Sequence, residues 1–231
     1  MARPLGSPAL VGLHDATDKL ESGQQVLLDG YSGLLILDPT PETLWHYGEL
    51  EHRKVQVAEQ LTGLRETKST TRDGRHIVLS ANIELPDEVE AAPRNGAEGI
   101  GLYRTEFLYL NRTTLPSEEE QYATYRKVAE QVQPHPLIIR TFDLGGDKVA
   151  GMMDSGDESN PFMGERAIRF CLEHPDMFKA QLRAIIRASA VGNVKIMFPM
   201  ISGMEELRRA LACLEEAKAR LEREGTAFNR E

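Results

Sequence analysis

Cysteine is scarce in this 231-residue chain, with Cys171 and Cys213 as the two thiols. Two isolated cysteines offer neither metal-ligand spacing nor a disulfide framework, so we expect each to be a small buried hydrophobe. Such cysteine usage suits a reducing compartment, and we expect a cytoplasmic protein. Long apolar runs and the apolar core of a signal peptide are also missing, so we expect no insertion into a membrane.

Basic residues are outnumbered, with 27 Lys and Arg against 36 Asp and Glu and a net charge of -9. A duplex would be repelled on average, so the composition argues against a nucleic-acid-binding protein. An acidic protein that binds an anion must instead gather a few cations at one place. Individual Arg and Lys positions are therefore more informative than the overall charge.

The first third of the chain predicts small β elements and then a helix. Short strands are expected at 8–12, 25–30 and 33–39, the last two forming a hairpin. This is too little to form a core, so residues 1–40 are interpreted as the end of a domain. Residues 41–75 are interpreted as a helical linker, with Thr40 as the N-cap and Pro41 in the first turn.

From His76 onward, apolar strands alternate with amphipathic helices. Strands are expected at 77–83, 99–103, 137–141 and 194–198. Helices are expected at 87–95, from Ser117 to Val132, across 164–190 and from Ser202 onward, with capping boxes at Ser117 and Ser202. This order predicts an α/β fold with a parallel sheet, either the first four units of a TIM-type β/α barrel (residues 76–231) or a small open doubly wound sheet.

Cationic side chains stand at the ends of two of these strands and in the loop that follows the second of the two. Arg104 follows the second strand, Arg140 lies within the end of the third, and Lys148 lies in the loop after the third. The carboxyl ends of barrel strands carry ligand sites, and Arg binds carboxylates and phosphates through paired hydrogen bonds. The alternative is structural pairing, with Glu106 as partner of Arg104 and Asp143 as partner of Arg140. By the same reasoning Arg166 and Arg169 are expected to be solvated helix residues.

Five ordered motifs resemble one known family, Enzyme I of the bacterial sugar phosphotransferase system, a phosphoenolpyruvate-protein phosphotransferase. They are GLYRTEFLY at 101–109, LPSEEEQ at 115–121, IRTFDLGGDK at 139–148, NPFMGERAIR at 160–169 and KIMFPMI at 195–201. The resemblance covers essentially the whole chain.

The resemblance implies a transferase that passes the phosphoryl group of phosphoenolpyruvate to a histidine on a swivelling domain and then to the carrier protein HPr. It implies that Arg104 and Arg140 grip the substrate and that Lys148 and Arg166 bind its phosphate. Mg²⁺ is the implied cofactor, and the full-length family forms homodimers. Residues 1–40 would then be the remnant of the swivelling phosphohistidine domain.

The same resemblance places the phosphohistidine upstream of Met1, and the Mg²⁺ ligands and the proton-donating cysteine beyond Glu231. We therefore expect no catalytic residue and no metal ligand within the 231 residues, and no transfer activity by this chain alone. Two alternatives stay open at this stage. One is part of a pyruvate phosphate dikinase or phosphoenolpyruvate synthase, and the other is a non-catalytic binding half-barrel.

Overall fold

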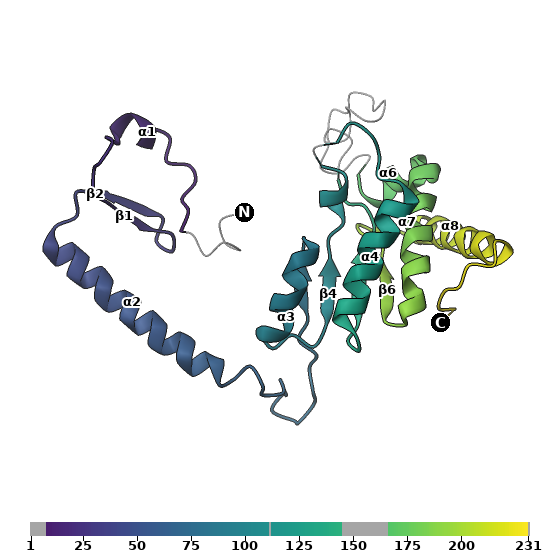
Figure 1. Cartoon of the computed structure of the whole chain (residues 1–231), viewed down its shortest axis with the longest axis horizontal. Coiled ribbons are helices and arrows are strands. Elements are labelled where there is room, and N and C mark those ends of the chain that lie inside the picture. Colours follow the sequence, from purple (N-terminus) through teal and green to yellow (C-terminus); the bar gives the residue numbers. More distant parts are fainter. Residues whose placement is uncertain (1–7, 111, 145–165, 231) are drawn as a thin grey trace. The chain divides into compact units, whose positions relative to one another are not determined.

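The computed structural model describes residues 8–110, 112–144 and 166–230, and its chain divides into two compact units, Met1–Leu64 and Arg65–Glu231 (Figure 1). The sequence-based division into domains 1–40, 41–75 and 76–231 stays a prediction. None of the described helices is both long and apolar enough to span a bilayer.

The first unit contains a short helix, α1 (Ala16–Lys19), and the predicted hairpin of β1 (Val26–Asp29) and β2 (Leu34–Leu37). The strands are antiparallel, and the Asp29 carboxylate accepts the N–H groups of Tyr31 and Ser32 in the turn. The strand expected at 8–12 was wrong, because no strand forms there and Val11 is 95% exposed. With nothing packed on its side chains, an extended apolar segment gains little from a sheet position.

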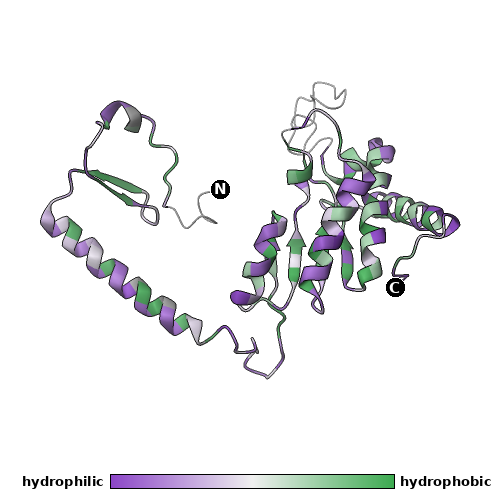
Figure 2. Cartoon of the chain, in the orientation of Figure 1, coloured by the Kyte–Doolittle hydropathy of each residue, from purple (hydrophilic) through white to green (hydrophobic). Residues whose placement is uncertain are grey.

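The long helix α2 (Pro41–Thr62) begins as the sequence predicts, because the hydroxyl of Thr40 accepts the Thr43 N–H at 3.2 Å and Pro41 follows. Apolar and polar residues alternate along it (Figure 2), and Trp45 is 69% exposed. Both clusters of buried hydrophobic residues in the described chain belong to the second unit. The hairpin and α2 therefore have no comparable core of their own.

Four parallel strands form the sheet of the second unit: β3 (Ala81–Ile83), β4 (Ile100–Tyr103), β5 (Leu137–Arg140) and β6 (Val194–Met197). Their spatial order is their order in the sequence. Adjacent parallel strands in chain order, with helices between them, are the first four units of a β/α barrel. The predicted α/β class and partial barrel are confirmed.

Helices cover one face of this sheet. The helices of the second unit within the described residues are η1 (Pro86–Glu90), α3 (Ala91–Arg94), η2 (Glu106–Leu108), α4 (Glu118–Val132), α6 (Ile168–Glu173), α7 (Pro175–Ala188), η3 (Ser189–Val191) and α8 (Met204–Arg223). On β5 the side chains alternate, with Leu137 and Ile139 buried and Ile138 and Arg140 half-buried. Since successive strand residues face opposite ways, Arg140 lies on the less covered face.

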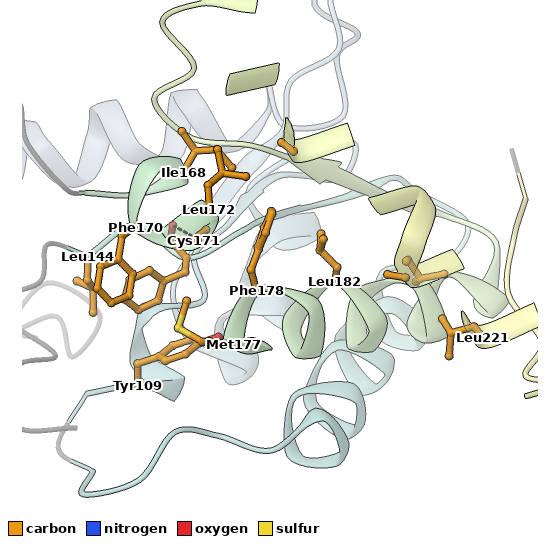
Figure 3. Packing of buried hydrophobic residues seen from close by; sticks show 14 residues of the cluster. Tyr109, Leu144, Ile168, Phe170, Cys171, Leu172, Met177, Phe178, Leu182 and Leu221 are labelled. Atoms are coloured by element: carbon orange, nitrogen blue, oxygen red, sulfur yellow. Dashed lines mark hydrogen bonds between the residues drawn. The ribbon is translucent and has the colours of Figure 1, made fainter. Parts of the chain in front are cut away.

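Packing of α7 against α4 and α8 forms the centre of this layer (Figure 1). One cluster joins α7 to β3, β4, β5 and α4, and the other joins it to α6 and α8. In the second cluster Phe178 and Leu182 project from the same side of α7 (Figure 3). Burying such side chains stabilises a fold by about 1.5–3 kcal/mol each, and α7 contributes them to both clusters.

Capping boxes were predicted at the starts of two helices, and the structure contains one of them. The capping box at Ser117 is confirmed, because its hydroxyl accepts the Glu120 N–H while the Glu120 carboxylate accepts the Ser117 N–H. The box predicted for Ser202 was wrong: α8 has Gly203 as its N-cap, and the Ser202 N–H donates to Glu206 at 2.7 Å. The first strand is also shorter than predicted, since Ile77, Val78 and Leu79 are about half exposed and only 81–83 pair with β4.

Candidate functional site

The candidate site lies at the carboxyl edge of the sheet, where Glu84, Arg104 and Arg140 stand at the ends of three neighbouring strands. Backbone hydrogen bonds continue past the strands, from the Arg104 N–H to the Ile83 carbonyl and from the Thr141 N–H to the Met197 carbonyl, each at 3.0 Å. The sheet therefore fixes the backbone on which these side chains are carried.

Arg140 is the best-enclosed cation of the site. Its Nη2 donates to Glu106 Oε1 at 2.9 Å, and its Nη1 lies 2.8 Å from Asp143 Oδ2. The three side chains are only 18%, 13% and 10% exposed. The predicted pairing of Arg140 with Asp143 is confirmed, and Glu106 is a second partner. Two carboxylates hold this guanidinium in one orientation.

Arg166 reaches the same carboxylate from another part of the chain. Its Nε lies 3.4 Å from Asp143 Oδ1, and its side chain is 35% exposed. The next residue, Ala167, has φ 54°, a value that costs energy for a residue with a Cβ. Asp143 thus brings together Arg140 and Arg166, which are 26 residues apart in sequence. Arg166 is therefore no freely solvated residue.

Arg104 has a different partner from the one the sequence suggested. Its Nη1 contacts the Glu84 carboxylate, which stands beyond the end of β3, while Glu106 is taken by Arg140. The Arg104 side chain is 42% exposed, the most open of the three arginines. Glu84 was missed because its pairing depends on strand order. Its place just after a strand was the available signal.

The fourth predicted site residue, Lys148, lies outside the described residues, as do the two glycines of the motif at 139–148. Arg169 was expected to be solvated, and that was wrong. Its Nε donates to Glu206 Oε1 at 2.8 Å and its guanidinium to the Ser202 hydroxyl, so it joins α6 to the start of α8.

Three polar atoms of the site are buried without a hydrogen bond to any described residue: Arg140 Nε, Asp143 Oδ1 and Arg166 Nε. Buried polar groups are nearly always bonded, so this edge has unused hydrogen-bonding capacity. Formal charge within the described set is balanced, with Arg104, Arg140 and Arg166 facing the carboxylates of Glu84, Glu106 and Asp143. An anionic ligand here would have to compete with carboxylates.

A resident metal ion does not fit this set of side chains. Among residues 8–110, 112–144 and 166–230, no three His, Cys, Asp or Glu side chains are grouped so that they could hold one. The carboxylates at the edge are each engaged by a guanidinium, as in the pairing of Asp143 with Arg140. We therefore derive no step through a metal from these residues.

The cysteines lie apart from this chemistry. Cys171 is fully buried, as expected, and burial strongly raises the pKa of its thiol. Cys213 is only partly buried, and burial raises the pKa of its thiol as well. Since the nucleophilic form of cysteine is the thiolate, neither cysteine has the environment of a nucleophile.

Comparison with known proteins bears directly on this edge. The family model described as "PEP-utilising enzyme, PEP-binding domain" matches residues 58–231, and "PEP-utilising enzyme, mobile domain" matches residues 1–33. The chain belongs to the PEP-utilising enzymes. The first match includes all the strands of the parallel sheet, so this family uses the scaffold that carries Arg104, Arg140 and Arg166.

Relatives within the PEP-utilising enzymes are close. The chain is 48% identical over 227 residues to the phosphoenolpyruvate-protein phosphotransferase of Geobacillus stearothermophilus and 44% identical over 225 residues to that of Staphylococcus carnosus. These alignments cover 98% and 97% of the chain but 39% of each relative's length. The resemblance to phosphoenolpyruvate-protein phosphotransferases is confirmed, and a dikinase or synthase is not favoured.

Proposed function

We propose that the second unit binds phosphoenolpyruvate at the carboxyl edge of its sheet, as the substrate-binding part of a phosphoenolpyruvate-protein phosphotransferase. The observation that carries this proposal is the convergence of Arg140 and Arg166 on Asp143. Two guanidiniums held side by side suit a small ligand that carries both a carboxylate and a phosphate. The match of the PEP-binding domain model to residues 58–231 supports the choice of ligand.

In this proposal Arg104 and Arg140 grip the substrate, and Arg166 and Lys148 bind its phosphate. The guanidiniums contribute orientation and charge compensation, because fixed cations around a transferring phosphoryl group stabilise charge that develops in the transition state. Paired acids help by fixing the arginines before the ligand arrives. Arg140, between Glu106 and Asp143, is the best prepared of the three described arginines.

The rest of the reaction is proposed for a full-length protein of this kind. The phosphoryl group would pass to a histidine of the mobile domain and then to the HPr carrier protein, with the protein acting in the cytoplasm as a homodimer. Mg²⁺ would neutralise phosphate charge. Its ligands are expected outside this chain, and we accordingly expect no transfer to HPr by the chain alone.

Calorimetric titration of the chain with phosphoenolpyruvate tests the binding proposal. Arg140→Gln should weaken binding at least about tenfold, because a charge-assisted bond to a buried cation is lost. Arg187→Gln is the matched control: Arg187 is 20% exposed and also pairs with two carboxylates, those of Glu118 and Glu119. Equal affinities for wild type and Arg140→Gln, or no binding by wild type, would refute the proposal.

A further inference from the structure

A polar side chain is completely buried in the apolar face of α7. Gln181 is 0% exposed and lies on the same side of the helix as Phe178, Leu182 and Ile185, which are also fully buried. Glutamine at such a position costs stability unless its amide is fully bonded. The hydrogen-bonding partners of Gln181 therefore indicate its structural role.

Two of these partners lie just beyond strand ends, and the third, Tyr125, lies on α4. The Gln181 Oε1 accepts the Phe142 N–H at 2.9 Å, while its Nε2 donates to the Thr105 hydroxyl at 3.1 Å and to the Tyr125 hydroxyl at 3.3 Å. The Thr105 hydroxyl in turn donates to the Arg140 carbonyl at 3.1 Å. Because only the oxygen of the amide can accept the backbone N–H, the orientation of Gln181 is determined.

These bonds join the two loops that carry the candidate site. Thr105 lies between Arg104 and Glu106, and Phe142 lies directly before Asp143. One side chain of α7 therefore holds the backbone N–H of Phe142 in one loop and the side chain of Thr105 in the other. We propose that Gln181 and Thr105 are positioning residues, which set the placement of Arg104, Arg140 and Asp143 for an incoming phosphate or carboxylate.

The network is extended behind Gln181 by further buried polar groups. Tyr125 and Tyr109 both donate from their hydroxyls to Gln121 Oε1 at 3.1 Å, and Gln121 Nε2 donates to the Pro116 carbonyl. Tyr109 lies close behind the Glu106 loop, with its ring 4.7 Å from that of Phe142. An apolar core could fill this space, but it could not specify one position for each loop, whereas directional bonds do.

This inference rests on the proposed function, so its test needs one measurement without ligand and one with it. Thr105→Val removes the hydroxyl at nearly constant shape, and Thr105→Ser restores it. Ser189→Ala is the matched control: Ser189 is 8% exposed, donates to the Ile186 carbonyl and accepts the Asn229 N–H. Gln181→Met is a second variant that removes the network from the helix side.

Without ligand, amide hydrogen exchange of Phe142 and of residues 105–109 is measured by NMR. Thr105→Val and Gln181→Met should speed exchange at both loops at least about tenfold, and Thr105→Ser and Ser189→Ala should not. With phosphoenolpyruvate, the first two variants should bind at least about tenfold more weakly, because a small misplacement of binding groups is costly.

The outcomes separate the two proposals. Unchanged exchange in Thr105→Val and Gln181→Met would overturn the positioning role, whether or not the ligand binds. Equal losses of affinity in Thr105→Val and Ser189→Ala at matched thermal stability would also overturn it, because they would show a purely structural effect. A wild-type chain that does not bind phosphoenolpyruvate would overturn the proposed function and leave the exchange measurement to decide the role of Gln181.

Discussion

The carboxylate of Asp143 approaches the guanidinium of Arg140 to 2.8 Å, three residues away along the chain, and both side chains are largely buried. Removing the charge with Asp143→Asn leaves Arg140 with Glu106 as its remaining carboxylate partner. We expect a loss of about 1–3 kcal/mol in the free energy of unfolding, since a buried charge becomes less well compensated. Urea denaturation of wild type and Asp143→Asn measures this loss in unfolding free energy. Asp87→Asn, which alters a 95% exposed side chain, should change stability by less than about 0.5 kcal/mol.

Glu206 should make the start of α8 sensitive to acid. Hydrogen bonds from Arg169 and from the Ser202 backbone lower the pKa of Glu206 from 4.5 to about 2. A lowered carboxyl pKa contributes stability that is fully present above about pH 4.5 and is lost as the pH falls through about 2. Glu206→Gln should therefore lower the urea midpoint at about pH 6 more than at about pH 3.5. If Glu206→Gln lowers the urea midpoint equally at the two pH values, the prediction is contradicted. Glu205→Gln, at an exposed position of the same helix, serves as the control.

Thiol reactivity should differ between the two cysteines. Cys171 is fully buried, and burial raises the pKa of its thiol far more than that of the partly buried Cys213. With iodoacetamide under native conditions, we expect modification of Cys213 first and of Cys171 only as the protein opens. Peptide mass spectrometry resolves the two sites, and in denaturant the two rates should become similar. Equal rates of modification of Cys171 and Cys213 in the native protein would contradict the burial of Cys171 by the packing of α6.

The capping box of α4 gives a direct test of a local sequence signal. Ser117→Ala removes the acceptor for the Glu120 N–H. The expected cost is about 1 kcal/mol of unfolding free energy, the usual value for a lost N-cap. Thr114→Ala, at an exposed position before the helix, should leave stability within about 0.5 kcal/mol. Equal costs for the two variants would mean that the cap contributes nothing.

Elements with strong local signals were predictable. Three of the four parallel strands, the hairpin and α4 follow from apolar runs and capping residues, and their order along the chain predicts the sheet. The strand at 8–12 and the first half of the strand at 77–83 were wrong, because a short apolar run becomes a strand only where another strand pairs with it. Partners of that kind are set by the tertiary fold.

The site was only partly predictable for a similar reason. The pairing of Arg140 with Asp143, three residues apart, could be anticipated from the chain, whereas Glu84 with Arg104 and Glu206 with Arg169 depend on elements far apart in sequence. Gln181 carried one signal, a lone amide on an apolar helix face. Its link to Thr105, 76 residues away, could not be deduced from spacing.

The mutual pairing of arginines and acids at the sheet edge bears on selectivity. Chloride or another simple monovalent ion gains little there, because every guanidinium of the described set already faces a carboxylate. A ligand with two anionic ends can replace several such contacts at once and so outcompete the internal acids. Without a ligand, the site would thus bind few of the simple salt ions around it, at the expense of some affinity for a ligand with two anionic ends.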